Sequence, residues 1–191
     1  PVISKANGVP FNNPAQRLKD AVKRGMKLIV IDPRQTETAR RAAIHIQPRP
    51  GEDATILAGM INVIIGEGLY DKDFIASDVD GFEILKRQVA GFTPDYVARR
   101  AEVPSAQLVE AARLFATYGE RGGMANAGTG VNMSQHGNLT EYLALCIATI
   151  CGRWPRAGEK VHRPNVMLPA YTAKAQPSGP FRGWGYGEKL R

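Results

Sequence analysis

Residues 27–38 have the sequence Lys-Leu-Ile-Val-Ile-Asp-Pro-Arg-Gln-Thr-Glu-Thr, and this stretch decides the fold. It opens with a short β-branched apolar run that lies between a charged segment and a polar turn. A parallel strand covered on both faces has this pattern, because it needs no polar alternation. Asp32 stands at the carboxyl end of the predicted strand, where open α/β sheets bind their ligands. We therefore expect Asp32, Arg34 and Thr36 to face a ligand.

Each of these three residues also has a simpler interpretation. Asp32-Pro33 is a common turn sequence, Arg34 could be an ordinary solvent-exposed arginine, and Thr36 could cap a short helix. The same holds for Gly51-Glu52-Asp53, which begins a helix. Helix starts bind anions through free N–H groups, but simple capping by Asp53 explains the pattern equally well.

The composition restricts the class of partner. The chain has 191 residues, of which 43% are hydrophobic, enough for one core with an appendage. Its net charge of +7 favours anionic partners. Basic and aromatic residues interleave only near Arg182, Trp184 and Tyr186, so we expect no nucleic-acid partner. No apolar run is as long as a transmembrane helix, so we expect no membrane insertion.

The two cysteines, Cys146 and Cys151, lie five positions apart, on different faces of a predicted helix. This spacing matches no zinc motif, and we expect buried thiols and no metal ligand in the chain. Reduced cysteines favour the cytoplasm over the periplasm. The remaining groups form no recognisable catalytic set, so we assign no catalytic residue.

Helix signals dominate the rest of the chain. Asn13 and Pro14 begin the first predicted helix, and Gly66 and Gly68 end a strongly apolar one that follows Asp53. We expect a second strand over residues 43–47 and helices over residues 14–24, 53–65, 71–77, 80–90, 93–101, 105–118 and 138–151. The core stripe expected in the last helix is Leu139, Leu143, Cys146, Ile147 and Ile150. Residues 122–130, rich in glycine, are expected to form a buried strand running into a tight loop, and an extended tail follows from Gly152.

Several segments together resemble the large subunit of molybdopterin-dependent oxidoreductases, the dimethyl sulfoxide reductase and formate dehydrogenase family. The first group comprises residues 27–38, residues 44–53 (Ile-His-Ile-Gln-Pro-Arg-Pro-Gly-Glu-Asp) and residues 67–75. The second comprises Gly128-Thr129-Gly130, Gln135-His136-Gly137-Asn138 and residues 151–159. The resemblance covers roughly residues 10–170, and the order and spacing of the motifs match as well as their sequences.

The resemblance implies a fold and a cofactor. The fold is a Rossmann-like three-layer α/β/α domain with a mostly parallel sheet and a helical insertion, over residues 1–160 and incomplete at the N-terminus. Residues 161–191 would be an extended tail or linker toward a missing domain. The cofactor is molybdenum or tungsten bis-molybdopterin guanine dinucleotide. The residues that the resemblance places at its guanosine part or its pterin are Asp32, Pro33, Arg34, Thr36, Gly51, Glu52, Asp53, Gly130, Met133, Gln135 and His136.

The family also carries parts that this sequence lacks. An iron–sulfur cluster and the metal-binding residue would lie upstream, so the chain resembles a central fragment that is inactive alone. The implied partners are the rest of the catalytic subunit and an iron–sulfur electron-transfer subunit. The alternative is a non-catalytic α/β nucleotide-binding or interaction module that kept the fold and lost the redox chemistry.

Overall fold

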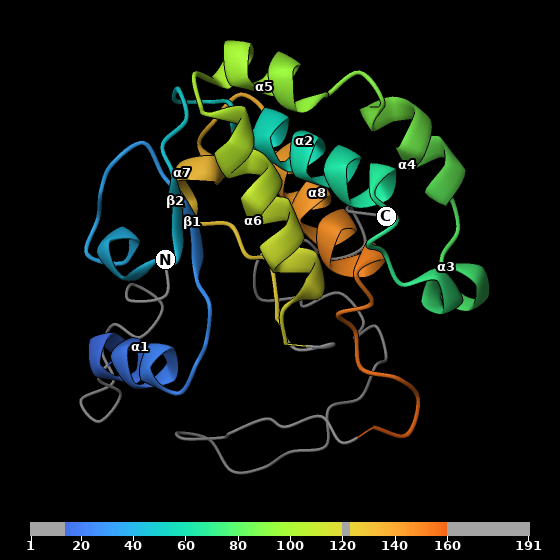
Figure 1. Ribbon diagram of the computed structural model, residues 1–191, viewed down its shortest axis with the longest axis horizontal. Coiled ribbons are helices and arrows are strands. Elements are labelled where there is room, and N and C mark those ends of the chain that lie inside the picture. Colours follow the sequence, from blue (N-terminus) through green and yellow to red (C-terminus); the bar gives the residue numbers. More distant parts are fainter. Residues whose placement is uncertain (1–13, 120–122, 160–191) are drawn as a thin grey trace, which may run out of the picture. The chain divides into compact units, whose positions relative to one another are not determined.

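The computed structural model describes residues 14–119 and 123–159. The chain divides into two compact units, Pro1–Trp154 and Pro155–Arg191, and the fold discussed below is that of the first. Figure 1 labels its α-helices and strands. The elements are α1 (Pro14–Lys23), β1 (Ile29–Ile31), the 3-10 helix η2 (Ala39–Arg41), β2 (Ile44–Ile46), α2 (Asp53–Gly66), α3 (Lys72–Asp78), α4 (Phe82–Val89), α5 (Pro94–Ala101), α6 (Ser105–Thr117), α7 (Thr129–Asn132) and α8 (Gly137–Ile150). The proposed Asn13 cap and the predicted tail over residues 161–191 lie outside the described residues.

The two predicted strands form a parallel pair. Ile29 pairs with Ile44 and Ile31 with Ile46, and the amide of Asp32 donates to the carbonyl of Ile46 at 3.1 Å. This confirms the parallel α/β prediction. The strand expected within residues 122–130 is wrong for the described part, residues 123–130. There the chain runs without a strand until α7 begins at Thr129, because this small-residue segment offers few side chains to pack on a sheet.

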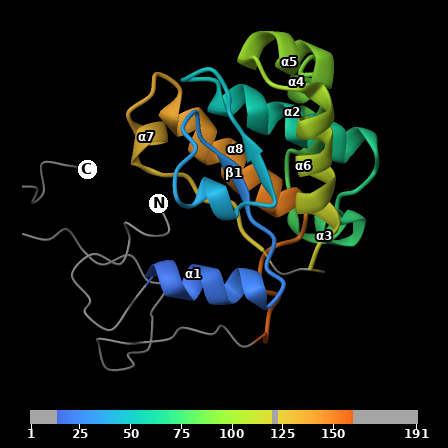
Figure 2. The same cartoon turned by 60° about the vertical axis from the view of Figure 1, so that its left-hand side comes forward.

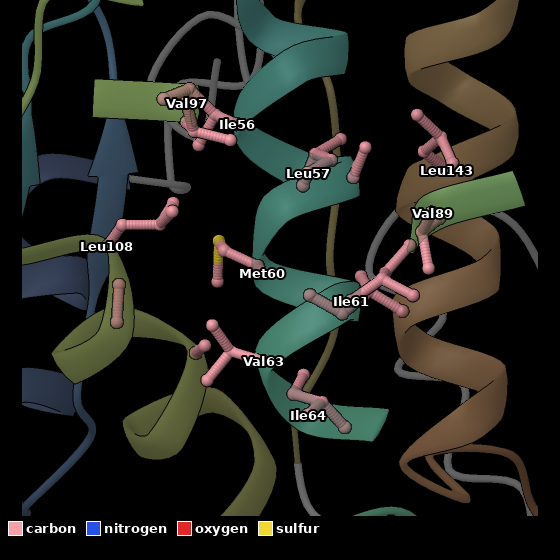
Figure 3. Packing of buried hydrophobic residues seen from close by; sticks show 14 of the residues in the cluster. Ile56, Leu57, Met60, Ile61, Val63, Ile64, Val89, Val97, Leu108 and Leu143 are labelled. Carbon is pink, nitrogen blue, oxygen red and sulfur yellow. The ribbon is translucent and has the colours of Figure 1, made fainter. Parts of the chain in front are cut away.

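Helix α2 is the centre of the core. Ten of its 14 residues are buried, and it packs against α4, α5, α6 and α8. Figure 3 shows Met60 pointing toward Leu108 on one side and Ile61 toward Val89 on the other. A helix covered on several sides carries apolar residues all round, as the sequence of α2 does.

Gly59 allows α2 to approach its neighbours closely. A Cβ atom at this position would stand 2.7 Å from Cγ2 of Val97 on α5 and 3.0 Å from Cδ2 of Leu108 on α6. Both neighbours are fully buried and cannot move into solvent. The glycine is therefore a packing requirement of this three-helix contact.

The predicted helical insertion is present as α3 to α6. Asp71 caps α3, since its Oδ1 accepts from the amide of Phe74 at 3.0 Å, and Thr93 caps α5, since its Oγ1 accepts from the amide of Tyr96 at 3.3 Å. Asp80 was expected to begin α4, but Gly81 holds that place with a left-handed φ of 82°. That conformation favours glycine, so the helix starts one residue later than the acidic cap predicts.

Helix α8 confirms most of the predicted core stripe. Leu143, Ile147 and Ile150 are buried, but Leu139 is 49% exposed, so its assignment to the core is wrong. Leu139 lies in the first turn of α8, whereas the three buried residues of the stripe lie further along the helix.

Arg153, three residues after the end of α8, donates hydrogen bonds to the C-terminal end of α6. Its guanidinium donates to the carbonyls of Phe115, Ala116 and Tyr118 at 2.5, 3.2 and 3.2 Å. These carbonyls belong to the C-terminal turn of α6, which lacks helical N–H partners and carries partial negative charge. The guanidinium of the buried Arg153 therefore supplies hydrogen bonds to the open carbonyls of a helix end, which is a structural role.

Cys151 is buried and Cys146 half-buried. Burial raises the pKa of Cys151 to about 12 and also raises the pKa of Cys146. At pH 8, about one Cys151 thiol in 10⁴ is then ionised, against about a quarter of free cysteine, and the thiolate is the reactive form. We expect alkylation of native Cys151 by iodoacetamide to be at least about 10³-fold slower than that of free cysteine. Mass spectrometry of native and urea-unfolded samples measures this, and equal labelling of both samples contradicts it.

Within residues 14–119 and 123–159, no helix is long and apolar enough to cross a bilayer.

Candidate functional site

The turn that follows β1 is held by its own backbone. Oδ1 of the half-buried Asp32 accepts from the amide of Arg34 at 2.8 Å, and the amide of Thr36 donates to the carbonyl of Arg34 at 2.9 Å. Thr36 in turn accepts from the amide of Ala39 at 3.2 Å. The turn and cap interpretations of Asp32 and Thr36 are thus both present. The bond to the amide of Arg34 uses one carboxylate oxygen of Asp32. A carboxylate can accept further hydrogen bonds, so Asp32 can still bind a ligand.

His45 of β2 and Gln47, which follows β2, bind the same turn from the neighbouring strand. Nε2 of His45 lies 2.9 Å from the carbonyl oxygen of Asp32, and Nε2 of Gln47 donates to the carbonyl of Pro33 at 3.3 Å. A carbonyl oxygen only accepts, so His45 carries its proton on Nε2. The turn after β1 is therefore bound on both its carbonyl and its carboxylate sides.

The second part of the site is the start of α2. Gly51 has a φ of 91°, which favours glycine, and Glu52 occupies the N-cap position. The prediction that Asp53 is the N-cap is wrong by one residue: Asp53 is the first residue of the helix. Its carboxylate still lies at the positive end of the helix dipole.

The surroundings of Asp53 shift its pKa. Burial raises its pKa, and the negative charge of Asp32 raises it further, although a hydrogen bond from its own amide opposes the shift. Both acids, which are 21 positions apart in the sequence, follow the parallel strands: Asp32 comes after β1, and Asp53 begins the helix after β2.

Glu52 is bound by the protein itself. It is 7% exposed, and its Oε2 accepts from Thr55 at 2.6 Å and from Nε of Arg100 at 2.8 Å. Burial alone opposes ionisation, but these hydrogen bonds and the charges of Arg100 and Arg49 outweigh it and hold the pKa of Glu52 below its usual value. Sequence reasoning missed Arg100, which lies 48 positions away and carries no local signal.

The third predicted group lies on the α7–α8 segment. Gly130, Gln135 and His136 are exposed, and Met133 is 84% exposed. Figure 2 shows α7 next to α8, against which it packs. A Cβ at Gly137 would stand 2.7 Å from the carbonyl oxygen of Val131, so glycine there lets α8 start directly against α7.

Three or more metal-ligating side chains do not gather anywhere in the described part of the chain. What the strand ends do offer is two acceptors, the carboxylates of Asp32 and Asp53, beside two donors, the N–H groups at the N-terminus of α2 and the guanidinium of Arg34 at the adjoining turn. Such a set suits a ligand that has both N–H or O–H donors and a phosphate.

The comparisons with known proteins identify the family. Residues 8–177 match the family model described as molybdopterin oxidoreductase.

The chain belongs to the molybdopterin oxidoreductase family.

Relatives of this family include the F420-dependent formate dehydrogenase subunit alpha of Methanocaldococcus jannaschii, 37% identical over 78% of this chain and 22% of the relative. Formate dehydrogenase H of Escherichia coli is 42% identical over 53% of this chain and 14% of the relative. The solved structure of acetylene hydratase from Pelobacter acetylenicus superposes with a TM-score of 0.71 at 36% identity, over 74% of this chain and 19% of that one. The chain thus spans between about a seventh and a fifth of the length of these molybdopterin oxidoreductases.

Membership of the molybdopterin oxidoreductase family confirms the resemblance seen in the sequence, and the shared fold with acetylene hydratase confirms the α/β class. The relatives are enzymes, and the formate dehydrogenase of M. jannaschii is described by its alpha subunit, so the family includes catalytic chains that work in assemblies. A molybdenum or tungsten pterin cofactor follows from the family.

Proposed function

We propose that this chain is the central segment of a molybdenum or tungsten oxidoreductase and binds the guanosine part of a bis-molybdopterin guanine dinucleotide. The observation that carries the proposal is the placement of two acids at the same edge of the parallel strands: Asp32 directly follows β1, and Asp53 begins α2, which follows β2. The charge of Asp32 is also one cause of the raised pKa of Asp53. The cofactor, when bound, supplies two-electron redox chemistry, and the role of this chain is to bind and orient it.

The chemistry of the pair selects guanine. Guanine has N–H donors at N1 and at its exocyclic amine, and two carboxylates accept from both. Adenine offers an acceptor at N1, which faces a carboxylate unfavourably. A ribose hydroxyl is a further donor for either acid. Burial of Asp53 strengthens each such bond, because the surroundings have a low dielectric.

Other predicted residues complete the site. In this proposal Arg34 binds a phosphate or the face of the base, Pro33 and Thr36 shape the turn of Arg34, and Gly51 lets the backbone approach the ligand. Glu52 contributes by fixing the turn before α2, since its carboxylate is already bound to Arg100 and Thr55. The remaining residues, on the exposed segment that would approach the pterin, are Gly130, Met133, Gln135 and His136.

The proposal extends to what lies outside this sequence. The implied partners are the rest of the catalytic subunit, with an iron–sulfur cluster upstream, and an iron–sulfur electron-transfer subunit. The chain alone is then expected to bind nucleotide without turning over substrate.

Calorimetric titration of the full chain with GDP and with ADP tests the function. We expect GDP to bind at least about tenfold more tightly, which corresponds to one additional good hydrogen bond to a charged group. Equal affinities for the two nucleotides, or binding of neither, would overturn the assignment.

A further inference from the structure

The end of α5 is attached to the turn that precedes α2. The amide of Arg49 donates to the carbonyl of Ala101 at 2.9 Å, and Nε of Arg100 donates to Oε2 of Glu52 at 2.8 Å. The guanidinium of Arg49 also lies 4.0 Å from the carboxylate of Glu102. The last two residues of α5, Arg100 and Ala101, and the C-cap Glu102 thus contact both ends of the turn over residues 49–52.

The hydrogen bond between Ala101 and Arg49 uses a carbonyl that the helix leaves open. The last carbonyls of an α-helix have no partner within the helix. Glu102 ends α5 with a left-handed φ of 59°, and its amide returns to the carbonyl of Ala98. Among the described residues it is the only non-glycine residue with a positive φ. The chain therefore keeps an unfavourable backbone conformation at the point where α5 meets the turn.

The bond between Arg100 and Glu52 is the strongest element of this attachment. The Glu52 side chain is 9% exposed, whereas that of Arg100 is 47% exposed. The carboxylate is therefore removed from water and depends on its protein partners, while the arginine reaches it from the surface. Removal of the arginine would leave a buried charge next to Asp53.

We propose that Arg100, together with the end of α5, is a positioning residue of the guanosine site: it holds the turn over residues 49–52 and thereby orients Asp53. This inference rests on the proposed function. Arg100 binds Glu52, and its effect on the ligand passes through Glu52 to the adjacent residue, Asp53. The helical insertion, far from the strands in sequence, is on this view part of the nucleotide site.

The test compares three variants of the full chain by GDP and ADP titration. Arg100→Gln is expected to weaken GDP binding about tenfold, because small displacements of a binding group cost this much or more. ADP binding is expected to change little, so the preference for GDP shrinks. Arg100→Lys keeps the charge but not the planar donor fork, and is expected to lie between the wild type and Arg100→Gln.

Arg113→Gln is the matched control. Arg113 on α6 donates to both carboxylate oxygens of Glu67 at 2.8 Å, and Glu67 is the C-cap of α2, at the other end of that helix from the turn over residues 49–52. It is expected to leave both affinities unchanged. If Arg100→Gln and Arg100→Lys bind GDP as the wild type does, the positioning role is wrong while the proposed function stands. If Arg100→Gln does not fold, Arg100→Lys decides alone. If the wild type shows no preference for GDP, both proposals fail.

Discussion

Replacement of Asp53 by Asn is expected to weaken GDP binding about 10- to 100-fold and, at the same time, to raise the melting temperature of the protein. The affinity falls because a charged acceptor in a partly buried site loses its charge, and hydrogen bonds to charged groups contribute about 1.5–3 kcal/mol. The stability rises because burial and the charge of Asp32 both disfavour ionised Asp53, as its raised pKa shows. Loss of affinity with gain of stability is the signature of a binding group rather than a structural one.

The pH dependence follows from the same raised pKa. The folded state holds the proton of Asp53 more tightly than the unfolded chain does, so ionisation costs stability as the pH rises from the ordinary carboxyl range through the raised value. The stability advantage of Asp53→Asn is therefore present at pH 7 and shrinks as the pH falls toward 4. The affinity of the wild type for GDP should also fall as the pH is lowered toward 4, because protonated Asp53 loses its negative charge. Thermal melts and titrations between pH 4 and 8 measure both.

Asp73→Asn is the control for this substitution. Asp73 is an exposed acid in the first turn of α3 and lies apart from the strand ends. Its replacement removes the same charge and should leave GDP affinity unchanged, with a small loss of stability from the helix dipole. An Asp53→Asn variant that binds GDP like the wild type, or that is less stable at pH 7, contradicts the assignment.

Replacement of Gly59 by Val is expected to destabilise the fold by about 3 kcal/mol, near the upper end of the usual range for overpacking. The first added carbon already meets Val97 at 2.7 Å and Leu108 at 3.0 Å, and the two further methyl groups need more room. Val97 is stiff at χ1 and fully buried, so it cannot rotate away. For a chain of this size the melting temperature should fall by about 6–12 °C.

Gly66→Val supplies the comparison within the same helix. A Cβ at Gly66 meets nothing within 4 Å, so the substitution tests only the change in helix propensity. It should alter the free energy of unfolding by less than about 0.5 kcal/mol. Urea denaturation of both variants gives the difference directly. Equal stability of the two would show that α5 and α6 can move away from α2.

Local signals predicted the elements well because their causes are local. The β-branched run before Asp32, the cap residues Asp71 and Thr93 and the apolar sequence of α2 each specify an element through neighbouring residues. The glycine-rich segment before α7 was harder, since small residues suit a strand or a loop equally. Helix boundaries shifted by a residue at Asp53 and Asp80, where Glu52 and Gly81 hold the cap positions.

The tertiary links of the site could not be predicted in this way. Nothing near Arg100 indicates that it binds Glu52, and nothing near His45 indicates that its ring reaches the carbonyl of Asp32. Arg153 belongs to a segment that resembles the family, yet its guanidinium donates to carbonyls at the C-terminal end of α6. Such contacts depend on how helices cross in space, which a pattern over adjacent residues does not encode. The placement of Asp32 and Asp53 at the same edge of the strands followed only from the family resemblance and the rule for strand ends.

The central place of α2 has a consequence for how the protein is made. Its apolar surface is covered on one side by α8, whose first residue, Gly137, comes 84 positions after Asp53. At synthesis rates of about 5–20 residues per second, that surface waits roughly 4–17 seconds for its cover after α2 has left the ribosome. We expect the nascent chain to need chaperone protection during that interval, although its helices form locally within microseconds. The slow step of assembly is then the arrival of α8.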